Sequence, residues 1–145
     1  MLRGACHCGT IAVELDTRAD PRELPLRACS CTFCRKHGAR TISDPAGRVR
    51  IALSGEVSRY RWGLATADFL VCARCGVYAG AVLRDGALAW AVINTRILED
   101  QSPFQREELP VSYDGEAAQD RIARRKLLWT PAEIVTRDAA LPSPA

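Results

Sequence analysis

Hydrophobic and polar residues alternate along much of this chain, which is the pattern of strands with one buried face. In residues 10–16, Ile11, Val13 and Leu15 alternate with small or charged residues. Similar runs predict further strands at residues 49–53, 57–62, 67–72, 77–83 and 87–94. Asp85 and Gly86, between the last two runs, are typical of a β-hairpin turn. The pattern therefore predicts a mainly β fold.

The last third of the chain has a different pattern. Residues 101–116 contain two prolines and little periodicity, so we expect a long ordered loop. Residues 116–129 predict one C-terminal helix, with acidic residues near its start and basic residues in its last turns. Residues 130–135 are expected to return as an edge strand. We expect a single domain over residues 1–136 and a frayed tail over residues 137–145.

Composition narrows the class of protein. The chain has 145 residues, of which 48% are apolar and 26% charged, as in ordinary soluble globular proteins. A net charge of +3 is too small to indicate a nucleic-acid partner. No apolar run approaches the ~20 residues of a membrane span, and the first residues lack the apolar stretch of a signal peptide. We therefore expect a cytoplasmic protein with neither nucleic acid nor membrane as a partner.

Seven cysteines change this ordinary picture. An odd number in a reducing compartment does not fit a disulfide framework. The cysteines instead form three groups with the short spacings typical of metal sites: Cys6 and Cys8; Cys29, Cys31 and Cys34; Cys72 and Cys75. The sequence therefore predicts that the thiols bind zinc.

Two of the groups resemble each other. CHCG (6–9) and CARCG (72–76) both end in Cys-Gly, and both precede a predicted strand. A glycine there can supply the positive φ that a tight turn around a metal needs. Cys6, Cys8, Cys72 and Cys75 are therefore predicted to close one structural zinc site. A less favoured grouping joins the first pair to Cys29 and Cys31, which splits the compact triplet.

The remaining triplet, Cys29, Cys31 and Cys34, has one ligand fewer than a closed zinc site. Three protein ligands with an open fourth position are the form of a catalytic zinc site. His37 is the rival for the fourth position, because it lies three residues after Cys34. Arg35 and Lys36 are candidates to bind the carboxylates of a substrate, and Arg61 is a weaker one.

These motifs resemble the glutathione-dependent formaldehyde-activating enzyme and centromere protein V family. The resemblance rests on GACHCG, CSCTFCRK and CARCG, and it extends over roughly residues 4–130. It implies several small coiled β-sheets around zinc knuckles. It also implies a structural zinc on Cys6, Cys8, Cys72 and Cys75, and a catalytic zinc on Cys29, Cys31 and Cys34. CGVYAG and YRWG are closer to the centromere protein V branch.

Two functions of different classes follow. The first is a carbon–sulfur lyase that acts on thiol–aldehyde adducts such as S-(hydroxymethyl)glutathione, with two zinc ions per chain and a small thiol as substrate. The second is a non-catalytic zinc module that binds a protein partner. For the second, the basic face of the predicted helix could contact an acidic partner: Arg121, Arg124, Arg125 and Lys126.

Overall fold

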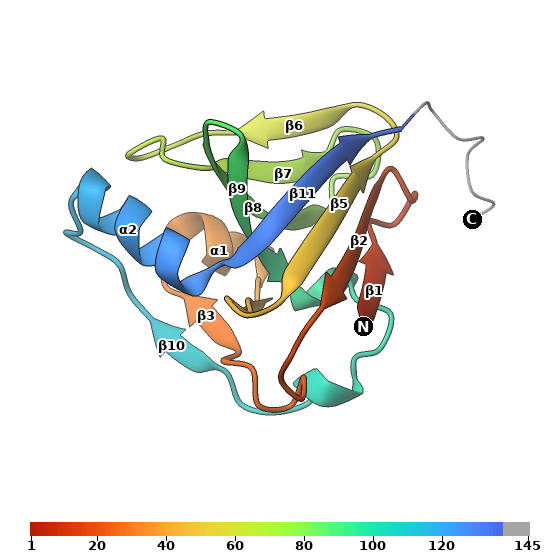
Figure 1. Cartoon of the computed structure of the whole chain (residues 1–145), viewed down its shortest axis with the longest axis horizontal. Coiled ribbons are helices and arrows are strands. Elements are labelled where there is room, and N and C mark those ends of the chain that lie inside the picture. Colours follow the sequence, from red (N-terminus) through yellow and green to blue (C-terminus); the bar gives the residue numbers. More distant parts are fainter. Residues whose placement is uncertain (138–145) are drawn as a thin grey trace.

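The structure is a computed structural model that describes residues 1–137, and it confirms a mainly β fold (Figure 1). The strands are β1 (Leu2–Ala5), β2 (Ile11–Asp16), β3 (Arg27–Cys29), β4 (Thr41–Ile42), β5 (Arg48–Leu53), β6 (Val57–Tyr60), β7 (Asp68–Cys72), β8 (Tyr78–Asp85), β9 (Leu88–Asn94), β10 (Leu109–Val111) and β11 (Thr130–Thr136). The α-helices are α1 (Thr32–His37) and α2 (Ala118–Leu128), and two short 3₁₀ turns are η1 (Thr95–Ile97) and η2 (Ser102–Phe104). The expected tail lies outside the described residues, except for Arg137.

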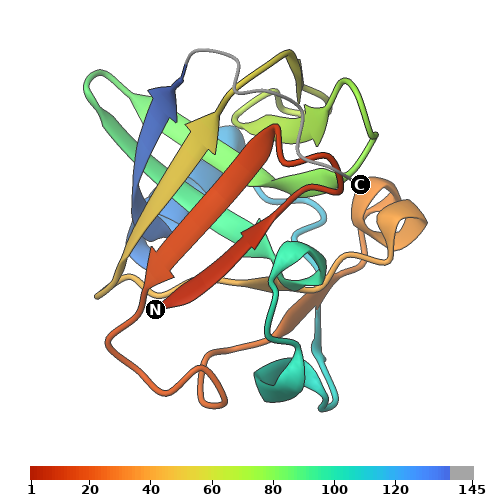
Figure 2. The ribbon, with the colours of Figure 1, turned by 90° about the vertical axis from the view of Figure 1, so that its right-hand side faces the viewer.

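The strands form two layers that share β11. One layer has the order β1-β2-β5-β11, with β11 parallel to β5. Figure 2 shows these four strands side by side, in front of β8 and β9. The other layer runs from β6 through β7 and β8 to β9, and then through β4 and β3 to β10. Hydrogen bonds therefore join all the strands into one sheet, where the family resemblance implies several small ones.

The prediction of an edge strand at residues 130–135 is wrong. Strand β11 lies inside the sheet, where Thr130 and Pro131 pair with β9 and the following residues pair with β5. Pro131 has no N–H group, so it favours an edge or a change of partner. The strand changes partner directly after this residue, which is how an interior strand accommodates the proline.

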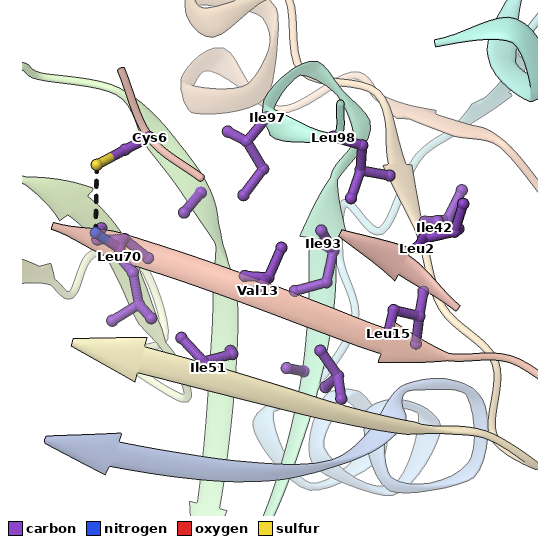
Figure 3. Packing of buried hydrophobic residues seen from close by; sticks show 14 of the residues in the cluster. Leu2, Cys6, Val13, Leu15, Ile42, Ile51, Leu70, Ile93, Ile97 and Leu98 are labelled. Carbon is purple, nitrogen blue, oxygen red and sulfur yellow. Dashed lines mark hydrogen bonds between the residues drawn. The ribbon is translucent and has the colours of Figure 1, made fainter. Parts of the chain in front are cut away.

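The buried face of the first layer packs on the second, as the alternation in residues 10–16 predicts. Ile11, Val13 and Leu15 are buried, and their side chains meet Ile51 and Ile93 in one cluster (Figure 3). Each such side chain stabilises the fold by about 1.5–3 kcal/mol. The cluster also includes Cys6 at one end, so the core directly supports the first cysteine turn.

Asp44 joins the end of the N-terminal hairpin to the start of β11. Its side chain accepts hydrogen bonds from the Thr17 hydroxyl at 2.7 Å and from the N–H groups of Arg18 and Ala46 at 2.8 and 2.9 Å. Its own N–H donates to the Thr130 hydroxyl at 2.8 Å. Although burial raises the pKa of Asp44, the hydrogen bonds outweigh it and hold the pKa below the usual value.

We expect Asp44→Asn to cost about 1–3 kcal/mol of unfolding free energy at pH 7, because an amide turns an N–H group toward donors. The folded pKa is depressed, so this stabilisation is complete above the unfolded pKa of about 4 and is lost as pH falls through the folded pKa. Urea unfolding at pH 7 and pH 3 tests this. A stability difference that is equal at both pH values would contradict it.

Candidate metal centres

Four thiols from opposite ends of the first half of the chain meet at the β1–β2 and β7–β8 turns. The sulfur atoms of Cys6, Cys8, Cys72 and Cys75 all lie within 4.8 Å of one another. The Sγ atoms of Cys6 and Cys8 are 3.8 Å apart, and those of Cys8 and Cys72 are 3.5 Å apart. Zinc–sulfur bonds of about 2.3 Å at tetrahedral angles separate sulfurs by about 3.8 Å. This donor set therefore fits a tetrahedral zinc ion.

The two turns have the same backbone design. The glycine after each second cysteine has a positive φ, 84° at Gly9 and 78° at Gly76. Each glycine N–H donates to the carbonyl of the first cysteine, at 3.0 Å to Cys6 and 2.9 Å to Cys72. This confirms the role that the sequence predicted for both glycines, because an L side chain at such φ values is strained.

Hydrogen bonds to the sulfurs favour their charged form. The N–H of Ile11 donates to the Cys6 sulfur at 3.2 Å, the dashed line in Figure 3. The Thr10 hydroxyl lies 3.2 Å from the Cys8 sulfur, and hydrogen bonds from Thr10 lower the pKa of Cys8 to about 6. Burial raises the pKa of Cys6 to about 12. The protein alone therefore stabilises some of the thiolates, and a bound cation would have to stabilise the rest.

The second cluster contains the sulfur atoms of Cys29, Cys31 and Cys34, which also lie within 4.8 Å of one another. Cys29 ends β3, where it pairs with Val111 of β10. Cys31 is the N-cap of α1, and its sulfur accepts a hydrogen bond from the Cys34 N–H at 3.4 Å. Gly38 ends this helix with a φ of 57°. The grouping of the seven thiols is the one favoured by the sequence. Strands β3 and β10 and helix α1, which position the triplet, were not predicted.

Three thiols at this distance cannot all ionise without a cation. Hydrogen bonds with Cys29 and Cys31, and then burial, raise the pKa of Cys34. Hydrogen bonds with Cys29 and Cys34 lower the pKa of Cys31. Like charges a few ångströms apart disfavour one another. A divalent cation that prefers sulfur ligands would allow all three thiols to lose their protons, so this cluster also fits zinc.

His37 does not complete this cluster. Its exposed ring packs on Phe33 and Tyr78, with ring centroids 4.4 and 5.4 Å away. Within residues 1–137, no histidine or carboxylate joins the three sulfurs in a group of mutual 4.8 Å separation. The geometry is therefore that of a three-ligand site with a free fourth position. His7, between two thiols of the other cluster, is also exposed.

The three-thiol cluster borders a cavity of about 140 Å³, room for several waters or a small ligand. All three of its cysteines line the cavity, whereas none of the four-thiol cluster does. Five aromatic side chains form much of the wall: Trp62, Phe69, Tyr78, Tyr113 and Trp129. Burial raises the pKa of Tyr78 well above its usual value, so this phenol remains a hydrogen-bond donor.

Four arginines face the same cavity, and their guanidinium groups have different partners: Arg27, Arg121, Arg124 and Arg125. Glu116 accepts from the Nε groups of Arg121 and Arg124, at 3.1 and 2.9 Å. Arg124 also lies over the Tyr113 ring, 3.5 Å from its centroid. Arg27 donates to the Ser43 hydroxyl at 3.0 Å. The cavity is thus rich in positive charge.

Comparison with known proteins agrees with this arrangement. The family model described as glutathione-dependent formaldehyde-activating enzyme matches residues 1–109. The chain belongs to this family. The crystal structure of a Rhodobacter sphaeroides protein is similar, with 28% sequence identity and a TM-score of 0.57. The match covers 74% of this chain and 97% of that one. The two cysteine clusters of this family member could therefore bind zinc, and the family suggests glutathione-dependent formaldehyde activation.

Arg35 and Lys36, the predicted carboxylate-binding residues, occupy a different place. Both are exposed on α1, and neither lines the cavity. Arg61 pairs with Asp68 at 2.5 Å and does not line it either. The guanidinium groups at the cavity come mostly from α2, which lies beyond the residues that the family model matches. The feature of the sequence that could have identified these arginines is their helical spacing at positions 121, 124 and 125, which places all three on one face of the helix.

We expect close to two zinc equivalents per chain in protein prepared without chelators. A limiting amount of chelator should remove the first equivalent from the three-thiol cluster, because that site has one thiolate fewer. Elemental analysis after graded chelation measures this. Cys31→Ser should hold one equivalent. Wild-type protein that never exceeds one equivalent after reconstitution with zinc would contradict the second site.

Proposed function

We propose that this protein is a zinc-dependent carbon–sulfur lyase that makes or breaks thiol–aldehyde adducts such as S-(hydroxymethyl)glutathione. The observation that carries the proposal is the position of the cavity. It is bordered by the three thiols that lack a fourth ligand and not by the four that form a complete set. A substrate in the cavity would therefore meet the one metal site that could accept another sulfur.

The reaction needs few groups. Breaking the carbon–sulfur bond of a thiohemiacetal releases an aldehyde, a thiolate and the hydroxyl proton. Zinc bound by Cys29, Cys31 and Cys34 would supply a Lewis acid that favours the thiolate form of sulfur. Tyr78 lines the cavity and can donate a hydrogen bond to the aldehyde oxygen. The Asp114 carboxylate lines it as well and can accept the hydroxyl proton.

The binding-module alternative has less support. Its basic helix face was expected to point to solvent, but Arg125 is buried. Arg121 and Arg124 are each 18% exposed and pair with Glu116. Lys126 forms an ion pair with Asp85. Most of the charge on this face is directed at the cavity or at an internal carboxylate, so little of it is available to a protein partner.

We also propose that residues 1–136 act as one domain in the cytoplasm. Strands from both ends of the described chain pair in one sheet, β2 with β5 and β5 with β11. All seven cysteines are free thiols, which fits a reducing compartment. No helix within residues 1–137 is both long and apolar enough to span a membrane.

Exchange NMR with ¹³C-formaldehyde and glutathione tests the lyase directly. We expect zinc-loaded protein to speed the interconversion of free formaldehyde and S-(hydroxymethyl)glutathione above the rate without protein. Chelation should remove the effect, and added zinc should restore it. An interconversion rate that zinc-loaded protein leaves unchanged, for glutathione and for other small thiols, would reject this function.

A further inference from the structure

Arg125 is a buried cation that has no carboxylate partner among residues 1–137. Its side chain comes from α2 and lines the cavity, yet the residue is only 8% exposed. Its Nη1 donates to the Thr66 hydroxyl at 2.6 Å, and its Nε has no hydrogen-bond partner. The guanidinium lies over the Trp129 ring, 4.7 Å from the centroid. These neutral contacts do not neutralise its charge.

A charge in such a place is costly unless an anion accompanies it. Removing a cation from water without a counter-charge destabilises a protein by several kcal/mol. Burial lowers the pKa of Arg125 to about 10, so the side chain is still charged near neutrality. Glu116 neutralises one of its two neighbours on α2, and among the described residues neither Glu116 nor Asp114, which lines the same cavity, forms an ion pair with Arg125. The missing counter-charge would therefore come from a ligand.

Trp62 lines the same cavity and carries a second unpartnered donor. The Nε1 of Trp62 is buried without a hydrogen-bond partner. Buried N–H groups normally have an acceptor, so two orphaned donors on one cavity indicate an absent acceptor group. A carboxylate offers acceptor oxygens and the negative charge together, and it matches the planar guanidinium.

We propose that the cavity selects small thiols that carry a carboxylate and that Arg125 is the specificity-determining residue that binds this carboxylate. The inference rests on the proposed function, since it assumes that the thiol of the same molecule meets the cluster of Cys29, Cys31 and Cys34. It assigns the carboxylate site to α2 in place of Arg35 and Lys36 on α1.

Two probes of equal length test the selectivity, 3-mercaptopropionate and 3-mercapto-1-propanol, titrated into zinc-loaded protein by calorimetry. Wild-type protein should bind the acid roughly 10- to 100-fold more tightly than the alcohol. Arg125→Met should reduce this ratio to about 1. Lys126→Met is the matched control, because it removes one positive charge from the next residue of α2, outside the cavity, and should keep the wild-type ratio.

The melting temperature separates binding from a structural role. An apolar replacement of an unpaired buried charge should keep or raise the melting temperature of the metal-loaded protein. If Arg125→Met does not fold, Arg125→Gln keeps a polar group for Thr66 and should show the same loss of selectivity. A wild-type ratio near 1, or a variant that melts lower and keeps the wild-type ratio, would overturn the proposal.

Propionate, which has no thiol, distinguishes this inference from the proposed function. At high concentration it should raise the melting temperature of wild-type protein and not that of Arg125→Met. If propionate stabilises only the wild type and 3-mercaptopropionate binds no more tightly than propionate, the carboxylate site stands and the lyase does not. If both thiols bind equally and propionate has no effect, the lyase stands and the carboxylate site does not.

Discussion

Cys75→Ser is expected to lose roughly 5 kcal/mol or more of unfolding free energy, which is most of the stability of a domain of this size. Cys75 belongs to the four-thiol cluster that joins the β1–β2 turn to the β7–β8 turn. A serine oxygen is a poor zinc ligand, and the binding energy of a structural zinc is folding energy. Thermal and urea unfolding of the zinc-loaded variant measure the loss.

Cys31→Ser is the matched control. Cys31 and Cys75 are both half-buried, so the two substitutions differ little in burial. Serine is also a good N-cap, so it can replace the Cys31 sulfur at the start of α1. Cys31→Ser should therefore fold and melt within a few degrees of wild type. Equal losses of stability in the two variants would contradict the division into a structural and a functional cluster.

The same Cys31→Ser variant is expected to lose more than about 100-fold of the accelerated thiol–aldehyde exchange, since a bound metal contributes several kcal/mol to such reactions. His37→Ala is the control at this site. The His37 ring packs on Phe33 and Tyr78 and is not part of the three-thiol cluster. Its removal should therefore change the exchange rate by only a few-fold. A folded Cys31→Ser protein with wild-type exchange would show that the triplet is not catalytic.

The sequence was informative where a local rule decides the structure. Period-two alternation located six of the strands close to their observed bounds. The reason is clearest in β2, where Ile11, Val13 and Leu15 are buried on one face of the strand. Gly9 and Gly76 were predicted from the repeat of Cys-Gly, because a positive φ is a property of the turn itself. The same repeat separated the four-thiol cluster from the triplet before any tertiary contact was known.

Features that depend on distant pairing were not predictable in this way. Strand β10 has only three residues and exists because it lies beside β3, so residues 101–116 seemed to be loop only. The helix α2 was predicted, but its arginines were expected on an outer face that could contact an acidic partner. A helical pattern does not show that this face will line a cavity together with Cys29. Arg35 and Lys36 were the more obvious candidates because they directly follow Cys34 in the sequence.

The most direct test of the account is the spectrum of cobalt-substituted protein during a glutathione titration. If the triplet of Cys29, Cys31 and Cys34 leaves a position for a substrate thiol, millimolar glutathione should change the thiolate–cobalt absorption bands. The apparent affinity should rise with pH below the pKa of the free thiol, because binding releases a proton. His37→Ala should respond as wild type does. A wild-type spectrum that glutathione and other small thiols leave unchanged from pH 6 to 9 would contradict the account.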